Sequence, residues 1–209
     1  MRWAGFSRTS RRSCTWAHSS QEEGNALADV LFGDYNPAGR LSTTWIGPLN
    51  DLPPMVDYDV RKGRTYQYSK GQLQYPFGFG LSYTTCEYSN LRTSADSVNA
   101  AGEISVSVDV KNTGTRAGDE VVQMYVKHLN SAVDRPVKEL RGVSGFRCSR
   151  TNQRTVPLQL KGSDLGYWDA DQHRFVAEPG KLSIMPGRLI CGRAAGEDDS
   201  SEVIRKRVA

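Results

Sequence analysis

Residues 104–127, ISVSVDVKNTGTRAGDEVVQMYVK, constrain the fold more than any other part of this sequence. Apolar side chains alternate with polar ones in two runs, at Ile104, Val106, Val108 and Val110 and then at Val122, Met124 and Val126. Because side chains alternate between the two faces of a strand, each run predicts a strand with one aliphatic face. A polar connection of seven or eight residues joins the runs and predicts a looped β-hairpin. Two strands alone are marginally stable in water, so flanking segments must supply further strands.

Five other segments predict those further strands, at residues 86–91, 137–146, 155–160, 174–177 and 181–185. Turn signals separate them, such as KGSD at 161–164 and EPG at 178–180. About seven short strands at this spacing are typical of an immunoglobulin-like β-sandwich. Pro157 limits its strand to a sheet edge or a bulge, because proline cannot donate a ladder hydrogen bond.

The segment before the predicted strands has the pattern of a helix and not of a strand. Apolar residues at Ala26, Leu27, Val30 and Leu31 form one stripe of a helix that Gly33 can close as a C-cap. A turn and a short strand at 41–46 follow, an order typical of the last unit of an α/β domain. One helix and one strand cannot enclose a core, so their apolar faces require a partner.

Three other segments have characteristic compositions. Residues 1–20 are rich in Arg and Ser without the continuous apolar core of a secretory signal, so we expect an unstructured start. Residues 47–83 are rich in Pro, Gly and aromatic residues and predict an ordered linker. Residues 188–209 end in mixed charges and predict a disordered, solvated tail.

The composition excludes several classes of protein. The hydrophobic share of 38% and the charged share of 24% are globular values, and no apolar run could cross a membrane. The net charge of +4 comes from the four arginines in residues 1–20, which leave 23 basic and 23 acidic residues in 21–209. A nucleic-acid partner would require basic residues gathered on one face, so we expect none.

The four cysteines are far apart, at Cys14, Cys86, Cys148 and Cys191. Without a C-x-x-C pair or a suitably spaced histidine they do not predict a zinc site. A disulfide between Cys86 and Cys148 is one alternative, and thiols packed as small apolar groups are the favoured one.

Several blocks of the sequence occur in a fixed order: QEEGNALADVLFGDYNPAGRLSTTW, GRTYQY, YPFGFGLSYT, VSVDVKNTGTRAGDEVVQMYV and RPVKELRG. Together they resemble the C-terminal part of glycoside hydrolase family 3, over about residues 21–187. DLPP at 51–54 and the spacing of GRTY resemble its β-xylosidase and β-glucosidase members.

In that family a TIM-like barrel precedes an α/β sandwich domain and, in many members, a fibronectin type III-like domain. The resemblance therefore implies a mainly β fold, in which an immunoglobulin or fibronectin type III-like β-sandwich follows a helix-strand remnant of the α/β domain. The implied divisions are a non-family start at 1–20, the remnant at 21–46, the linker at 47–83, the fibronectin-like domain at 84–187 and a tail at 188–209.

The resemblance also bears on chemistry. Retaining glycosidases need a nucleophilic and an acid/base carboxylate, and the family places its nucleophilic Asp on the barrel, so we assign no catalytic, cofactor-binding or metal residue and expect no cofactor. Carboxylates at Glu22, Asp57 and Asp59 have the positions of caps and loop ligands. The histidines His18, His128 and His173 lack a nucleophile arrangement.

Five aromatic residues in or beside the linker are candidates for sugar stacking or for docking: Trp45, Tyr66, Tyr75, Phe77 and Tyr83. Docking is favoured, because these rings are interleaved with Gly and Pro.

Two functions follow. The first is the C-terminal part of a β-glycosidase, which docks to the barrel and α/β domain of an enzyme hydrolysing O-glycosyl bonds, is inactive alone and has a β-linked saccharide as a candidate partner. The alternative is an autonomous carbohydrate-binding or adhesion module. Neither involves nucleic acid or a membrane. Residues 1–20 contain no signal peptide, although members of the family are often secreted, so no compartment is assigned.

Overall fold

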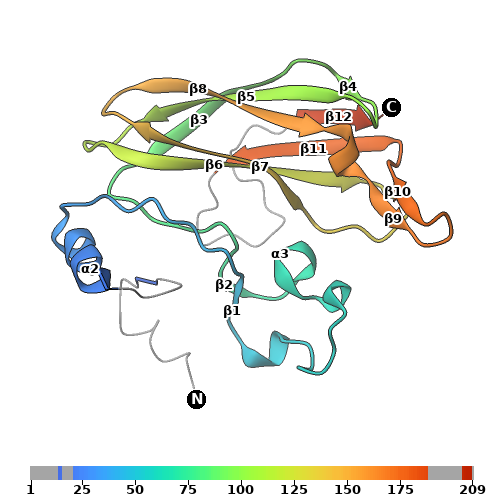
Figure 1. Cartoon of the computed structure of the whole chain (residues 1–209), viewed down its shortest axis with the longest axis horizontal. Coiled ribbons are helices and arrows are strands. Elements are labelled where there is room, and N and C mark those ends of the chain that lie inside the picture. Colours follow the sequence, from blue (N-terminus) through green and yellow to red (C-terminus); the bar gives the residue numbers. More distant parts are fainter. Residues whose placement is uncertain (1–13, 16–20, 188–203, 209) are drawn as a thin grey trace.

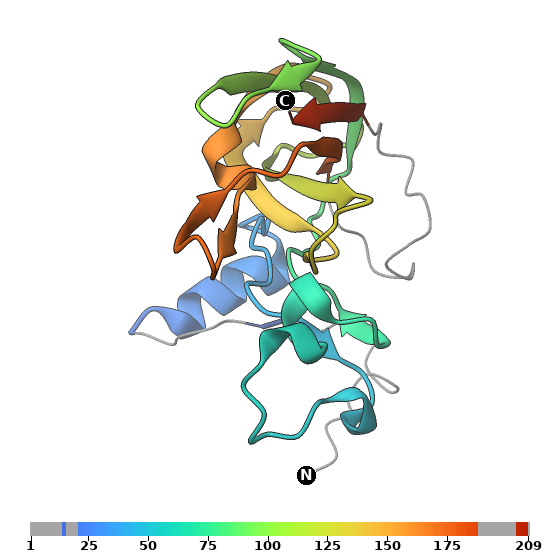
Figure 2. The same cartoon turned by 90° about the vertical axis from the view of Figure 1, so that its right-hand side faces the viewer.

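The computed structural model describes residues 14–15, 21–187 and 204–208. It is mainly β, as predicted, with two packed sheets forming a β-sandwich (Figure 1). The helix α2 and the linker lie together on one side of the sandwich, as the turned view in Figure 2 shows. Apart from residues 14–15, the predicted unstructured start lies outside the described residues.

The smaller sheet has three antiparallel strands in the order β3-β5-β8. Their bounds are Cys86–Thr93, Glu103–Asn112 and Gln153–Lys161. Pro157 lies in β8, an edge strand, which confirms the position predicted for it.

The larger sheet has five strands in the order β4-β12-β11-β6-β7. Their bounds are Ser97–Val98, Ile204–Val208, Gly180–Gly187, Gly118–Leu129 and Glu139–Cys148. All neighbours are antiparallel except β12 and β4, which are parallel.

The predicted hairpin between β5 and β6 was wrong, although both strands form. β5 pairs with β3 and β8, whereas β6 pairs with β11 and β7. The connection between them passes from one sheet to the other. Buried aliphatic side chains of both strands belong to one core cluster, among them Val106, Val108, Val122, Met124 and Val126. In opposite sheets the two aliphatic faces help to cover each other, which two neighbouring strands of a single sheet cannot do.

The tail prediction was wrong for residues 204–208, which form β12 against β11 and β4. Val208 is buried in the core, and the strand is completed by backbone pairing to β11. The sequence IRKRV did not predict strand β12, because its central residues are all charged. Residues 188–203 and 209 of the predicted tail lie outside the described residues.

A separate two-stranded hairpin, β9 (Tyr167–Asp169) with β10 (Arg174–Val176), follows the short 3-10 helix η4 (Gly162–Leu165). The predicted strand at 174–177 therefore forms, but in this hairpin and not in either sandwich sheet.

The first helix among the described residues is α2 (Glu23–Phe32), which ends at Gly33 in the left-handed conformation. The Gly33 N–H donates to Asp29 O, as expected of the predicted C-cap. None of the helix residues is buried. No helix in the described part of the chain combines the length and apolar character needed to span a membrane.

The predicted strand at 41–46 is shorter, since β1 covers only Trp45–Ile46 and pairs with β2 (Leu73–Tyr75) of the linker. Leu41 instead exchanges backbone hydrogen bonds with residues of the linker turn, donating to Phe79 O at 2.8 Å and accepting from Gly78 N–H at 2.7 Å. The linker also contains η2 (Leu49–Asp51), η3 (Val60–Lys62) and the single-turn helix α3 (Thr65–Tyr68).

Cys86 and Cys148 follow the favoured alternative, whereas Cys14 is exposed and Cys191 lies outside the described residues. Cys86 packs against the core, and Cys148 is a buried thiol whose Sγ donates to Asn152 O at 3.7 Å. Both act as small apolar groups.

Candidate functional site

The linker is joined to the sandwich at Gly78, which is buried and has a φ of +80°. Gln123 Nε2 of β6 donates to Gly78 O at 3.0 Å, and Tyr125 OH donates to Gln123 Oε1 at 2.6 Å. A Cβ at position 78 would lie 2.2 Å from Gln123 Oε1. Only glycine therefore allows the turn to approach β6 so closely. Burial raises the pKa of the Tyr125 hydroxyl, which stays protonated as a donor.

Aromatic rings reinforce this junction. The Tyr66 ring stacks on Phe77 with a centroid separation of 4.2 Å and meets the Tyr125 ring edge-on at 6.1 Å. The Tyr66 hydroxyl also accepts a hydrogen bond from the Leu140 N–H of β7 at 3.2 Å. Of the five candidate rings, Tyr66 therefore lies against the sandwich of the same chain, and Phe77 stacks on Tyr66.

The other three candidate rings also have contacts within the chain. Trp45 meets Tyr75 edge-on at 5.9 Å, and Tyr75 stacks on Phe79 at 5.2 Å. Tyr83 donates from its hydroxyl to Val30 O of α2 at 2.6 Å, with the Arg116 guanidinium 5.6 Å from its ring centroid. The structure thus divides the five rings between a sandwich junction, a β1–β2 cluster and the α2 end, and does not bring them into one platform.

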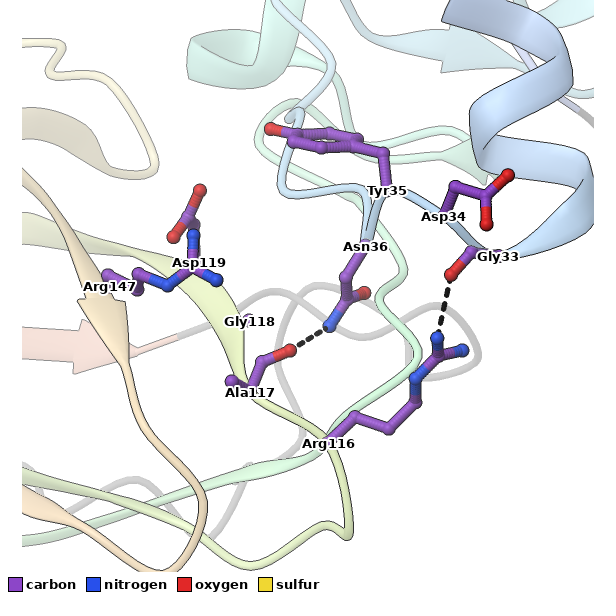
Figure 3. Close-up of a pocket in the computed structure, with 9 residues that line it drawn as sticks. All are labelled: Gly33, Asp34, Tyr35, Asn36, Arg116, Ala117, Gly118, Asp119 and Arg147. Carbon is purple, nitrogen blue, oxygen red and sulfur yellow. Dashed lines mark hydrogen bonds between the residues drawn. The ribbon is translucent and has the colours of Figure 1, made fainter.

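The end of α2 meets the sandwich around a polar hollow of about 340 Å³ (Figure 3). Across it, the Arg116 guanidinium donates to Gly33 O at 2.6 Å and Asn36 Nδ2 donates to Ala117 O at 2.9 Å. A Cβ on Gly118 would lie 2.3 Å from Asn36 Nδ2. The two hydrogen bonds join the N-terminal part to the sandwich, and the close approach at Gly118 leaves no room for a side chain, which indicates a structural seam.

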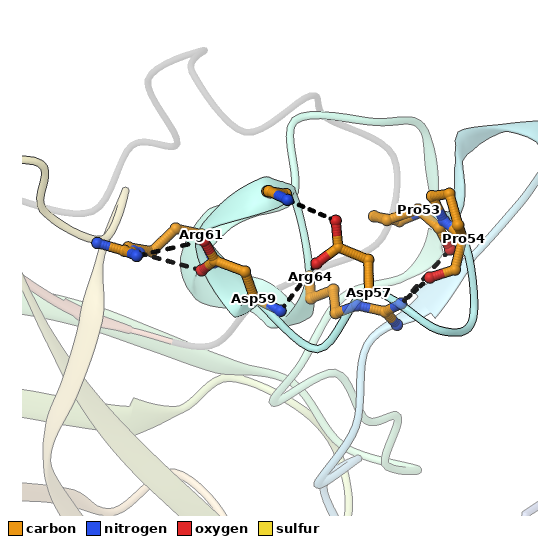
Figure 4. Close-up of polar contacts among 7 residues, drawn as sticks. Pro53, Pro54, Asp57, Asp59, Arg61 and Arg64 are labelled. Carbon is orange, nitrogen blue, oxygen red and sulfur yellow. Dashed lines mark hydrogen bonds and ion pairs between the residues drawn. The ribbon is translucent and has the colours of Figure 1, made fainter.

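The carboxylates considered for catalysis bind backbone and side-chain groups of their own loop. Asp57 accepts from Asp59 N–H at 3.1 Å and pairs with Lys62 Nζ at 2.7 Å, and Asp59 caps η3 by accepting from Arg61 N–H at 3.1 Å (Figure 4). Hydrogen bonds from Lys62 and Arg61 lower the pKa values of Asp57 and Asp59, respectively. Both carboxyls are therefore held ionised, whereas the general acid of a glycosidase requires a raised pKa.

Glu22 and the histidines have other surroundings. Glu22 stands at the N-cap position of α2, and its Oε2 accepts from Asn25 Nδ2 at 2.6 Å. His128 is half-buried in β6, and His173 is exposed in the turn of the β9–β10 hairpin. His18 lies outside the described residues. In the described ranges, no group of three or more His, Cys, Asp or Glu side chains is arranged to hold a metal ion.

Large exposed apolar side chains are concentrated before the sandwich. Ten of them lie between residues 31 and 83, namely Leu31, Phe32, Tyr35, Leu52, Met55, Val56, Tyr58, Val60, Leu81 and Tyr83. The described part of the sandwich has three, at Val143, Trp168 and Phe175. We call the ten the apolar surface. Exposed apolar side chains mark interaction sites where they stand together in a patch.

Sequence reasoning singled out Leu31 and Tyr83 from this surface but passed over Met55, Val56 and Tyr58. The signal available was the run LPPMVDYDV, in which apolar residues occur among prolines and acids without the period of a helix or strand.

Comparison with known proteins assigns the chain to a protein family. Residues 4–83 match the model of the glycosyl hydrolase family 3 C-terminal domain, and residues 120–189 match that of the fibronectin type III-like domain. The resemblance seen in the sequence is confirmed by these matches.

Relatives and solved structures agree with the family-model matches. A xylan 1,4-beta-xylosidase of Xylanibacter ruminicola is 41% identical over 81% of this chain and 19% of its own length. A periplasmic beta-glucosidase of Salmonella typhimurium is 36% identical over 83% of this chain and 24% of its own. The crystal structure of a beta-D-glucoside glucohydrolase from Trichoderma reesei superposes with a TM-score of 0.76 at 31% identity, covering 91% of this chain and 29% of that one.

This chain thus spans between about a fifth and a quarter of the length of the two curated relatives. The chain belongs to glycoside hydrolase family 3, and its two matched regions correspond to the C-terminal part of that family's enzymes.

Proposed function

We propose that this chain is the docking part of a β-glycosidase and binds the enzyme's remaining domains through the apolar surface. The distribution of exposed apolar side chains is the main support for this proposal. Ten lie between residues 31 and 83, and three lie in the described sandwich. The sandwich encloses its own core, whereas α2 buries none of its residues. A partner over α2 and the linker would supply the missing contacts.

The junction with the sandwich gives that partner a rigid platform. The bonds around Gly78, the stacked Tyr66 and Phe77 rings and the seam at Gly33 hold the linker in one position. A surface that is already ordered loses less conformational entropy on binding. The sandwich would therefore orient the linker, and the linker would bind the catalytic domains.

The whole enzyme would hydrolyse O-glycosyl bonds of β-linked saccharides, with its catalytic carboxylates outside this chain. Relatives named β-glucosidase and β-xylosidase support this reaction. The ionised, internally bonded Asp57 and Asp59 support the absence of a catalytic pair among the described linker residues. The five candidate rings are proposed for docking and internal packing, because each contacts another part of the chain.

A chimera tests the proposal. The matching region of the Xylanibacter ruminicola relative would be replaced by this chain, and hydrolysis of an aryl β-xyloside would be compared with that of the relative lacking this region. We expect activity in the chimera and none in the truncated relative. A chimera as inactive and unstable as the truncated relative would overturn the proposal.

The chain on its own provides the complementary test. We expect no release of nitrophenol from aryl β-glucosides or aryl β-xylosides above the buffer rate, because turnover needs two positioned carboxylates beside a sugar subsite. Release that a Glu22→Gln, Asp57→Asn, Asp59→Asn variant abolishes would show that the active site lies within this chain.

A further inference from the structure

Residues 51–64 form a loop, here called the anchor loop, whose apolar side chains point outward. Met55 is 89% exposed, Val56 is 84% exposed and Tyr58 is 87% exposed. Three large apolar side chains within four positions have not collapsed onto the chain. Something other than their own packing must therefore hold the loop open.

Polar contacts inside the anchor loop hold it open (Figure 4). The Asp57 carboxylate binds Asp59 N–H and Lys62 Nζ, and the Asp59 carboxylate binds both the backbone N–H and the guanidinium of Arg61. Because Asp57 lies between Val56 and Tyr58, these bonds fix the backbone from which both side chains project.

A second contact closes the other end of the loop. The Arg64 guanidinium donates to Pro54 O at 2.6 Å, directly before Met55 in the sequence. Proline at positions 53 and 54 restricts φ there, which lowers the number of conformations further. The loop is therefore ordered before any partner binds.

We infer that the anchor loop inserts Met55, Val56 and Tyr58 into an apolar recess on the part of the family 3 enzyme that this chain does not contain. The inference rests on the proposed docking function and assigns its central contact. A preorganised loop that carries aromatic and Met anchors resembles the energetic centre of a protein interface.

The surroundings of the three anchors fit that role. Arg61 and Lys62 are exposed beside them, so charged groups rim an apolar centre. Within the loop, Asp57 is neutralised by Lys62 and Asp59 by Arg61. The loop presents paired charges and no excess of one sign, which matches an apolar protein recess better than a nucleic acid.

Two facts favour the enzyme's other domains over a second copy of this chain. The chain covers only 19% and 24% of the lengths of the two relatives, so most of such an enzyme lies outside it. The anchor loop also belongs, like α2, to the match with the family 3 C-terminal domain at residues 4–83, so both exposed regions belong to one family unit.

The test uses the chimera described above. A Met55→Ser, Val56→Ser, Tyr58→Ser variant removes the three anchors and keeps the polar contacts of Asp57 and Asp59, here called the clamp. The matched control is Trp168→Ser, Phe175→Ser, which removes an apolar pair that is 54% and 70% exposed from the β9–β10 hairpin. We expect the anchor variant to lower the melting temperature of the chimera by several degrees and its activity several-fold, and the control to change neither.

The same anchor substitutions in the isolated chain separate docking from folding. The three side chains are almost fully exposed there, so we expect its melting temperature to stay unchanged. A fall there equal to that in the chimera would assign the residues a folding role and overturn the inference.

The clamp is tested with two substitutions at one position. Asp59→Asn keeps an oxygen for the Arg61 N–H, whereas Asp59→Ala removes both the cap and the ion pair. We expect Asp59→Ala to weaken the chimera more than Asp59→Asn, and to speed amide exchange at Arg61 in the isolated chain. Equal effects on the chimera, or an unchanged exchange rate in Asp59→Ala, would show that the carboxylate does not preorganise the loop.

The outcomes distinguish the inference from the proposed function. A wild-type chimera that is active but insensitive to the anchor substitutions overturns the anchor assignment alone. A wild-type chimera that fails to assemble overturns both. A discrete dimer of the isolated chain that the anchor variant dissociates, with no effect in the chimera, assigns the loop to a second copy and overturns the inference.

Discussion

The Arg40 guanidinium lies 2.6 Å from the Glu120 carboxylate, and both side chains are almost completely buried. Arg40 belongs to the segment after α2 and Glu120 to β6, so the ion pair joins the N-terminal part to the sandwich. Arg40 also donates to Ala38 O at 2.7 Å, and Glu120 accepts from Val121 N–H at 3.1 Å. Neither group can lose its partner without leaving a charge in a poorly solvated position.

We therefore predict that Arg40→Met lowers the free energy of unfolding by about 3–5 kcal/mol, the usual consequence of an uncompensated buried charge. The Arg40→Met, Glu120→Leu double variant should recover most of the loss, because it removes both charges. Urea unfolding measures both values. A single variant that loses less than about 1 kcal/mol would mean that solvent reaches Glu120.

The close contact at Gly78 gives a second prediction. Gly78→Ala would place a methyl group 2.2 Å from Gln123 Oε1 at a φ of +80°, so the linker turn must move away from β6. We expect a loss of more than about 1 kcal/mol and faster amide exchange in residues 77–80. Gly145→Ala is the control, since a Cβ there meets no atom within 4 Å. Similar stability of the two variants would contradict the contact.

The core of the sandwich gives a third. Val108 is 2% exposed in β5, so Val108→Asp would bury an unpaired carboxylate and should cost several kcal/mol, about 3–5. Ser107→Asp is the control on the opposite face of the same strand. Far-UV circular dichroism and thermal melting measure the difference. An unaltered melting curve for Val108→Asp would show that this face does not point inward.

His128 gives a prediction for pH dependence. Burial, and then the nearby Arg135 charge, lower the pKa of His128 from 6.5 to about 4, although Glu178 acts in the opposite direction. Because the unfolded chain binds a proton at a higher pH than the folded chain, stability should fall as the pH is lowered from about 6.5 to about 4. His128→Gln should remove this part of the pH dependence. Parallel stability profiles of the two proteins between these limits would contradict it.

Much of the sandwich was predictable because its strands carry local signals. The alternation at Val106, Val108 and Val110 predicts which face is buried, whatever strand lies beside it. Gly33 predicts the end of α2, since a left-handed C-cap depends only on neighbouring backbone groups. Pro157 predicts an edge strand, because its missing N–H cannot serve an inner ladder.

The apolar surface was predictable only in outline. The stripe along α2 indicated a missing partner, because one apolar helix face cannot be satisfied alone. Met55, Val56 and Tyr58 carried no such signal, since their exposure depends on the Asp57 and Asp59 clamps that the folded loop brings together. No periodic pattern marks a loop held by polar contacts.

The family, the mainly β fold and the buried face of each central strand were predictable from the sequence, because they follow from ordered blocks and local periodicity. The folded chain alone shows that β5 and β6 lie in opposite sheets, that 204–208 completes the larger sheet and that Arg40 pairs with Glu120. Strand partners and buried ion pairs join residues far apart in the chain. Their choice depends on which arrangement best covers the aliphatic faces of the sandwich and pairs its buried charges at once.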